Sequence, residues 1–187
     1  IVKSYIESFF KKTILHNRIS TARAGNVIGG GDISKNRLVP DIIYAINNNK
    51  RINIRNPNHI RPWQHVLDPI IGYLILAKKQ YKNKIENKVN SWNFGPNKND
   101  FKKVIDIVKY IKKLKNFNYN LQKDEGFKET TILKLNSDKA KKELKWSSKW
   151  NLNESLKKTI EWNTFAKKGS SIRDLCEKQF LMYINKK

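Results

Sequence analysis

Apolar residues recur at helical spacing along most of the chain, which predicts that helices form much of the fold. The predicted helices lie at residues 2–10, 38–46, 69–81, 104–111, 139–144, 152–165 and 172–183. The helix at 69–81 is apolar around most of its circumference and is therefore expected to be buried. The helix at 104–111 carries lysines opposite its apolar residues and is expected at the surface. No capping residue precedes the first helix, so we expect the sequence to start inside it.

Short extended segments separate these helices. They lie at residues 19–28, 52–54, 60–66, 91–94, 117–121 and 131–135. Their alternating or β-branched residues, and the Gly, Asn and Pro turns that follow several of them, predict strands. Strands that alternate with helices along one chain are typical of the α/β class. We therefore predict an α/β fold, without an internal repeat and without a linker that marks a domain boundary.

The composition predicts a globular protein. Hydrophobic residues make up 39% of the 187 residues and include five Trp, which is enough apolar surface for a core. The single cysteine, Cys176, has no internal partner for a disulfide, and no apolar run approaches the roughly 20 residues that span a bilayer. We therefore expect a soluble, cytoplasmic protein with no membrane partner.

The formal net charge of +23 is typical of nucleic-acid-binding proteins, because Lys and Arg displace counterions from phosphates. Here the excess is nearly all lysine, spread through helices and loops beside abundant Asn and Ile. Such enrichment often reflects an AT-rich genome, and the chain has no RNP-type aromatic pattern, zinc-ligand spacing or long basic block. We expect a solvated basic surface, and a basic nucleic-acid-binding module is the alternative.

Four glycines follow the first extended segment. Gly25, Gly29, Gly30 and Gly31 could form a phosphate cradle, but their spacing matches neither the dinucleotide fingerprint G-x-G-x-x-G nor the P-loop. A strand that ends in a glycine-rich turn commonly marks a site, and a plain turn is the alternative for such a loop on its own.

Several motifs follow one another in the order and spacing of a known enzyme family. They read RAGNVIGGGD, RLVPDII, INIRNP, RPWQHV and WNFGP. As a set they resemble the extended short-chain dehydrogenases that modify nucleotide sugars, and most closely the CDP-glucose 4,6-dehydratases. The resemblance runs from Tyr5 to about Tyr183, and RNPNHIRPWQHVLDP is its most distinctive part.

The resemblance implies a Rossmann-type α/β fold with a smaller substrate-binding α/β domain. Residues 1–35 would be the end of the Rossmann part, interleaved with a nucleotide-sugar-binding domain at 36–187, and the N-terminal NAD-binding half would be absent. Enzymes of this family use NAD to oxidise a hexose at C4, eliminate water across C5 and C6, and return the hydride to C6. The complete protein would be a homodimer that converts CDP-glucose to CDP-4-keto-6-deoxyglucose for deoxysugar and lipopolysaccharide O-antigen biosynthesis.

The catalytic Tyr-x-x-x-Lys pair of the family has no match in this sequence. No tyrosine precedes Lys3, and SYIESFF matches a later part of the same family helix. The resemblance therefore implies that both catalytic residues lie upstream of Ile1. We expect the chain to carry substrate-binding residues and to be inactive alone.

The resemblance assigns ligand contacts residue by residue. Asn26 matches a substrate contact, and Val27 beside it matches a contact on the nicotinamide side of NAD. Arg37 and Leu38 match residues that enter the substrate domain, and the Arg37 guanidinium can donate paired hydrogen bonds to pyrophosphate oxygens. Arg61 matches the family arginine that grips the diphosphate, with a structural ion pair as the alternative.

Further assigned contacts surround the nucleotide. Ile52, Asn53 and Ile54 match the strand that lies along the base, with plain sheet core as the alternative for both isoleucines. Asn93 matches an asparagine that reaches the nucleotide. Glu129 matches a partner for the ribose hydroxyls.

The remaining motif residues carry less functional weight. Trp63 and His65 point to the same side of one extended segment and are predicted mainly to pack. No His, Cys or carboxylate lies at ligand spacing from His65, so we predict no metal site. Ile33, Lys128 and Asn136 stand where the family usually has Trp, His and Asp. These departures leave the nucleotide and sugar open, and another nucleotide-sugar epimerase, decarboxylase or dehydratase is the alternative enzyme.

Overall fold

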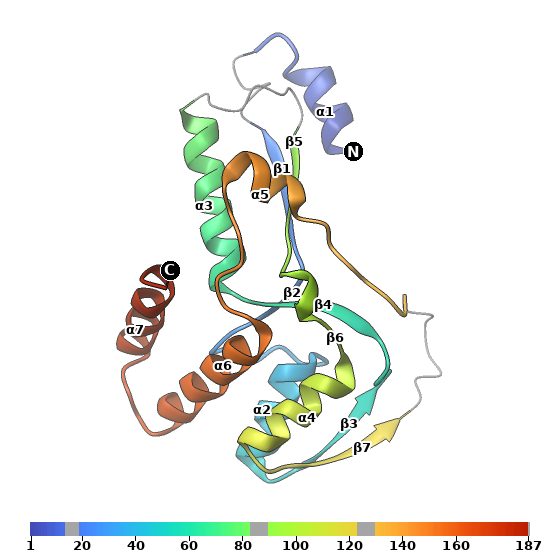
Figure 1. Cartoon of the computed structure of the whole chain (residues 1–187), viewed down its shortest axis with the longest axis vertical. Helices are drawn as coiled ribbons and strands as arrows, with labels where there is room; N and C mark the ends of the chain where they lie inside the picture. The colour runs from blue at the N-terminus through green and yellow to red at the C-terminus, as the bar shows by residue number, and fades with distance from the viewer. Residues whose placement is uncertain (14–18, 83–89, 123–129, 187) are drawn as a thin grey trace.

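The computed structural model describes residues 1–13, 19–82, 90–122 and 130–186, in which helices alternate with short strands (Figure 1). The helices are α1 (Val2–Phe9), α2 (Leu38–Asn48), α3 (Leu67–Tyr81), η2 (Lys98–Asp100), α4 (Val104–Leu114), α5 (Asp138–Leu144), α6 (Leu152–Lys167) and α7 (Ile172–Ile184). The strands are β1 (Ser20–Ala24), β2 (Asn26–Ile28), β3 (Arg51–Arg55), β4 (Ile60–His65), β5 (Asn90–Phe94), β6 (Phe101–Lys103) and β7 (Asn118–Gln122). The α/β prediction is confirmed. None of the described helices is long and apolar enough to cross a membrane.

The described strands form three small sheets. β1 and β5 pair in parallel, and β3 and β7 form a second parallel pair. β2 pairs in parallel with β4, whose first half pairs antiparallel with β6. The β1–β5 and β3–β7 pairs lie toward opposite ends of the molecule, with the β2–β4–β6 sheet between them (Figure 1). β2 and β4 therefore occupy the middle of the fold.

The chain passes from the first sheet to the middle sheet at Gly25. β1 ends at Ala24 and β2 begins at Asn26, yet these two strands pair with β5 and β4 respectively. A Cβ atom at Gly25 would lie 2.4 Å from the backbone oxygen of Pro62. Any other residue would therefore push β2 away from β4.

A hydrophobic core fixes the middle sheet against α2, α4 and α6. Ile42, Ile107, Val108, Ile111 and Leu156 are its most buried helical residues. The lysines of α4 lie on the opposite, exposed face of that helix. The prediction that 104–111 is a surface helix is confirmed.

The helix α3 is packed on one side only. Leu76 is buried against Trp92 and Phe94 of β5, whereas Ile70 and Tyr73 are exposed and Leu74 is 60% exposed. The expectation that this helix is buried on most sides is wrong for the described residues. The physical reason is that the elements in contact with α3, chiefly β4, β5 and α5, leave Ile70, Tyr73 and Leu74 open to solvent.

The strand prediction fails at two places. Residues 131–135 form no strand, because their only described sheet contact is an isolated bridge between Ile132 and Ile60. β6 was not predicted, because three residues are too few to show a pattern. Its partner β4 lies some forty residues earlier, so this pairing is set by tertiary packing.

Candidate functional site

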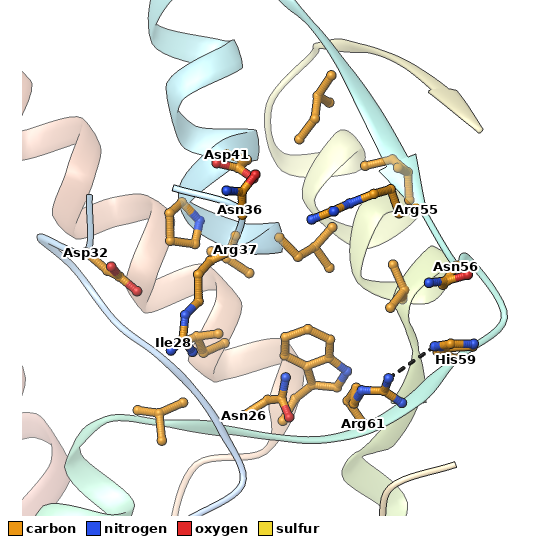
Figure 2. Close-up of a pocket in the computed structure, with 18 of the residues that line it drawn as sticks. Asn26, Ile28, Asp32, Asn36, Arg37, Asp41, Arg55, Asn56, His59 and Arg61 are labelled. Carbon is orange, nitrogen blue, oxygen red and sulfur yellow. Dashed lines mark hydrogen bonds between the residues drawn. The ribbon is translucent and has the colours of Figure 1, made fainter. Parts of the chain in front are cut away.

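A cavity of about 540 Å³ opens between the start of α2 and the strands β2, β3 and β4 (Figure 2). This volume lies within the range of small-molecule sites. Eight of the ten assigned ligand contacts line the cavity: Asn26, Val27, Arg37, Leu38, Ile52, Asn53, Ile54 and Arg61. The fold therefore brings together residues that the sequence spreads over four separate segments.

Arg61 is the most buried charged group of this cavity, with 6% of its surface exposed. Its Nη1 atom donates to the backbone oxygens of Ile60 at 2.9 Å and Thr131 at 3.3 Å. Its Nη2 atom lies 3.1 Å from Nδ1 of His59 (Figure 2). Because a guanidinium only donates, that histidine nitrogen accepts the hydrogen bond. Arg61 is thus held in one orientation at the cavity wall, which suits recognition of a planar or forked anion.

Asn26 and Val27 reach the cavity from β2, which β4 holds in register. Asn26 lies opposite Trp63, and Val27 lies opposite Gln64. The Trp63 indole donates to a backbone oxygen of β6 at 3.1 Å, and the Gln64 amide donates to the Phe94 backbone oxygen at 2.7 Å. Both side chains are buried, so the prediction that Trp63 packs is confirmed. They fix the strand that presents Asn26 and Val27.

Arg37 and Leu38 stand at the junction between the glycine loop and α2. Arg37 has extended backbone geometry and immediately precedes the helix. Its exposed side chain runs along the cavity toward Ile28 (Figure 2). Leu38 packs against the hydrophobic core. A second guanidinium therefore reaches the cavity from a different element than Arg61.

The strand β3 forms the apolar part of the cavity wall. Ile54 is fully buried in the hydrophobic core, and Ile52 packs on the edge of that core. Asn53 accepts a hydrogen bond of 3.3 Å from the Asn120 amide on β7. The sheet-core role allowed for the two isoleucines is thus present, and their contact with a base stays a prediction.

Six polar residues line the cavity that the sequence did not assign. They are Asp32, Asn36, Asp41, Arg55, Asn56 and His59. Asn36 and Asn56 have positive φ angles of 62° and 49°, which Asn tolerates better than most residues. The turn signal in RNPNH was visible in the sequence, but the hydrogen bonds that Pro57 and His59 accept from the start of α4 were not.

Burial raises the pKa of Asp41 above its ordinary value. The backbone N–H of Asn36 and the positive charge of Arg55 act in the opposite direction on this carboxyl group. The charges of Asp41 and Arg55 therefore interact at the cavity wall, although Asp41 belongs to α2 and Arg55 belongs to β3.

Two assigned residues lie elsewhere. Asn93 does not line the cavity, and its side-chain amide donates to the Asn136 backbone oxygen at 3.1 Å. Glu129 and the neighbouring Lys128 lie outside the described residues. The ligand roles of Asn93 and Glu129 stay predictions.

The glycine loop is shaped by contact with protein side chains. A Cβ atom at Gly30 would lie 2.1 Å from the indole of Trp162 in α6, and one at Gly29 would lie 2.8 Å from Val66. Gly31 has a φ of +80°, a conformation that favours glycine. Close packing and backbone geometry explain these glycines, which agrees with discounting the two nucleotide-binding glycine motifs.

His65 lies outside this cavity and is buried beside Trp150, with ring centroids 4.6 Å apart. Burial lowers the pKa of His65 to about 4, so its ring is neutral near pH 7. Its Nδ1 atom accepts a hydrogen bond from the Leu67 backbone. The packing role predicted for His65 is confirmed. Among the described residues no group of His, Cys, Asp or Glu could hold a metal ion.

The cavity chemistry suits binding of an anionic ligand. Three arginines, Arg37, Arg55 and Arg61, share its wall with two carboxylates, Asp32 and Asp41. Guanidinium groups bind phosphate oxygens through paired hydrogen bonds. An apolar wall from β3 and Leu38 adds a surface on which a flat ring can pack.

No family model matches the chain. The chain is 36% identical over 184 residues to the CDP-glucose 4,6-dehydratase of Salmonella typhimurium. The match covers 96% of this chain and 51% of that enzyme, so the chain spans about half the length of this curated relative. The resemblance to CDP-glucose 4,6-dehydratases indicated by the motifs is confirmed.

Solved structures of nucleotide-sugar enzymes share the fold. The dTDP-glucose 4,6-dehydratase of Bacillus anthracis, in complex with NAD, gives a TM-score of 0.69 at 18% identity and covers 88% of this chain and 49% of its own. The UDP-glucose 4-epimerase of Stenotrophomonas maltophila, with NAD and formylated UDP-arabinopyranose, gives a TM-score of 0.73 at 14% identity. The match covers 90% of this chain and 54% of the epimerase chain. The predicted fold, that of the NAD-binding dehydratases and epimerases, is confirmed.

Proposed function

We propose that this chain is the nucleotide-sugar-binding segment of an NAD-dependent CDP-glucose 4,6-dehydratase. The observation that carries the proposal is the buried and oriented Arg61 guanidinium, in a cavity lined by six other residues assigned to the same substrate. The similarity to the Salmonella enzyme favours CDP-glucose among nucleotide sugars.

Each part of a nucleotide sugar has a matching group in the cavity. Arg61 would donate to the diphosphate, with Arg37 as a second donor from α2. The Asn26 amide can donate to and accept from the sugar hydroxyls. The apolar face of Ile52 would pack against the base. These contacts bind and orient the substrate.

The cavity wall leaves room for a cofactor ring beside Val27. This small apolar side chain lines the cavity and is only half-buried, so a flat ring can lie on it without displacing a packed residue. When bound, NAD would be the oxidant that accepts a hydride from the sugar. Val27 would then orient the ring, and Asn26 would hold the sugar beside it.

Finer parts of the proposal concern the complete enzyme. Asn93 and Glu129 would complete the nucleotide contacts, and the Rossmann part would end near residue 35. The enzyme would act as a cytoplasmic homodimer, with the catalytic Tyr-x-x-x-Lys pair supplied outside this chain. Its product would serve deoxysugar synthesis, for example for the lipopolysaccharide O-antigen.

Calorimetric titration of the chain with CDP-glucose tests the binding role. Arg61→Ala should weaken binding by about tenfold to a hundredfold, because a charge-assisted hydrogen bond contributes roughly 1.5–3 kcal/mol. Arg61→Lys keeps the charge and loses the forked hydrogen bonds, so its affinity for CDP-glucose should lie between those of the unsubstituted chain and Arg61→Ala. Arg173→Ala is the matched control, since Arg173 is exposed on α7 and pairs with Glu177. Absence of binding to the unsubstituted chain, or an equal loss in the control, would contradict the proposal.

The reaction itself requires protein that also carries the remaining length of the relative. With CDP-glucose and NAD, mass spectrometry of the product should show loss of one water. A product of unchanged mass would identify an epimerase and overturn the dehydratase assignment.

A further inference from the structure

Asp41 and Arg55 stand where the cavity meets a second one. The adjoining cavity has a volume of about 410 Å³ and shares Asn36, Asp41, Ile52, Asn53 and Arg55 with the first. Figure 2 shows the Arg55 side chain extending from β3 toward Asn36 and Asp41. A carboxylate and a guanidinium thus line one end of the cleft together.

The two groups have complementary hydrogen-bonding character. An ionised carboxylate only accepts hydrogen bonds, and a guanidinium only donates them. Burial raises the pKa of Asp41, and the positive charge of Arg55 acts against this effect and favours the ionised form. This end of the cleft therefore offers an acceptor beside a donor.

The edge of a cytosine ring has the matching pattern. Its exocyclic amine is a donor, and the neighbouring ring nitrogen and carbonyl oxygen are acceptors. Uracil and thymine carry a carbonyl in place of the amine and an N–H in place of the bare ring nitrogen. Bound in the same ring position as cytosine, those bases would place an acceptor against the carboxylate and a donor against the guanidinium.

We propose that Asp41 and Arg55 select a cytosine base, with Asp41 accepting from the exocyclic amine and Arg55 donating to the acceptor edge. This inference rests on the proposed nucleotide-sugar function and adds to it the residues that set the base. Leu38, Pro40 and Ile52 supply apolar surface around the pair for the flat ring.

The positions of the other charged residues agree with this placement. Arg61 and His59 lie together on another part of the wall, away from Asp41, so the diphosphate and the base occupy separate places (Figure 2). Asp32 also lies apart from Arg55, near Arg37, and its carboxylate accepts from the Ser34 backbone at 2.9 Å. Asp41 is therefore the carboxylate placed to act together with Arg55.

Calorimetric titration of the chain with CDP and with UDP tests the inference, because the two probes share the diphosphate and differ only in the base. CDP should bind roughly tenfold to a hundredfold more tightly, the range expected of one good bidentate base contact. Asp41→Asn should bring the ratio close to one, since an amide can turn to present either a donor or an acceptor. Arg55→Gln should reduce the ratio for the same reason.

Asp32→Asn is the matched control, because it removes the same charge from the same cavity and should leave the ratio unchanged. Equal binding of CDP and UDP by the unsubstituted chain overturns base selection and leaves nucleotide binding intact. A control that changes the ratio as much as Asp41→Asn overturns the assignment to Asp41. If neither nucleotide binds, the proposed function fails together with this inference. Thermal unfolding of each variant shows that it is folded.

Discussion

Gly30 shows how a single residue can report on the packing of the glycine loop. A Cβ atom at Gly30 would overlap the indole of Trp162, which is buried in α6. Gly30→Ala should therefore lower the free energy of unfolding by about 1–3 kcal/mol, the usual cost of overpacking. Urea denaturation measures this change.

The matched test repeats Gly30→Ala in a chain that carries Trp162→Ala. With the indole removed the extra methyl meets no ring, so its cost should fall to a small fraction of the original. An equal cost in both backgrounds would show that Gly30 is required for another reason.

His65 should make the stability of the chain depend on pH. Burial holds its pKa at about 4 in the folded state, below the ordinary value of 6.5, so the unfolded chain takes up the proton first as pH falls. The free energy of unfolding should therefore decrease between about pH 6.5 and pH 4, by an amount on the order of 3 kcal/mol, and level off below. Denaturant titrations at several pH values give this profile.

Asp68 has the opposite effect on the free energy of unfolding. Burial raises the pKa of Asp68, so as pH falls the folded state protonates this carboxylate before the unfolded chain does. The contribution of His65 is therefore isolated by comparison with His65→Gln, which keeps an acceptor for Leu67. The slope between pH 6.5 and 4 should become smaller in this variant. An unchanged slope would exclude His65 as its source.

The C-terminal helix α7 packs on α6 and is also joined to the start of α3 through a buried hydrogen bond. The Tyr183 hydroxyl donates to Asp68 at 2.5 Å, and Trp150 packs edge-on against both His65 and Tyr183. The Lys149 ammonium donates to backbone oxygens at the end of α7. These contacts join α7 to the start of α3, 115 residues earlier in the sequence.

Tyr183→Phe should loosen this attachment. It leaves a buried carboxylate oxygen with one donor fewer, which costs about 1–3 kcal/mol. Hydrogen exchange should become faster in α7 and stay unchanged in α4. Tyr81→Phe on the exposed part of α3 is the control, and equal exchange in both variants would show that Asp68 does not hold the helix.

The sequence predicted those elements whose evidence is local. The helices α2, α4 and α6 were visible because their apolar residues repeat at regular spacing. The segments that contain β2 and β4 were visible because of their extended patterns and the turn residues beside them. The exposure of Leu74 and the strand at Phe101–Lys103 depend on which elements happen to cover them. The same holds for the site: Arg61 was assigned from its motif, whereas Asp41 entered only through the folding of α2 beside β3.

The net charge of +23 makes weak attraction to nucleic acid an expected property of the whole molecule. A surface of scattered lysines should bind duplex DNA at low salt and lose about a thousandfold or more in affinity between 50 and 200 mM salt, if several phosphates are contacted. CDP-glucose, with a single diphosphate, should lose much less. Parallel titrations of both ligands against salt measure this difference, and DNA binding that persists at 200 mM would favour the nucleic-acid alternative.

The close contact at Gly25 limits which mutations this position can accept. Every single-nucleotide change in a glycine codon that alters the residue gives Ala, Val, Ser, Cys, Arg, Trp, Asp or Glu, and each of these carries a Cβ atom. The obstructing atom at residue 62 is a backbone oxygen, so no replacement of Pro62 makes room for it. Neutral drift can therefore replace the residues on either side of Gly25 more easily than Gly25 itself. The passage of the chain between the two sheets at Gly25 should persist longer in descendant sequences than the charged residues of the cavity wall.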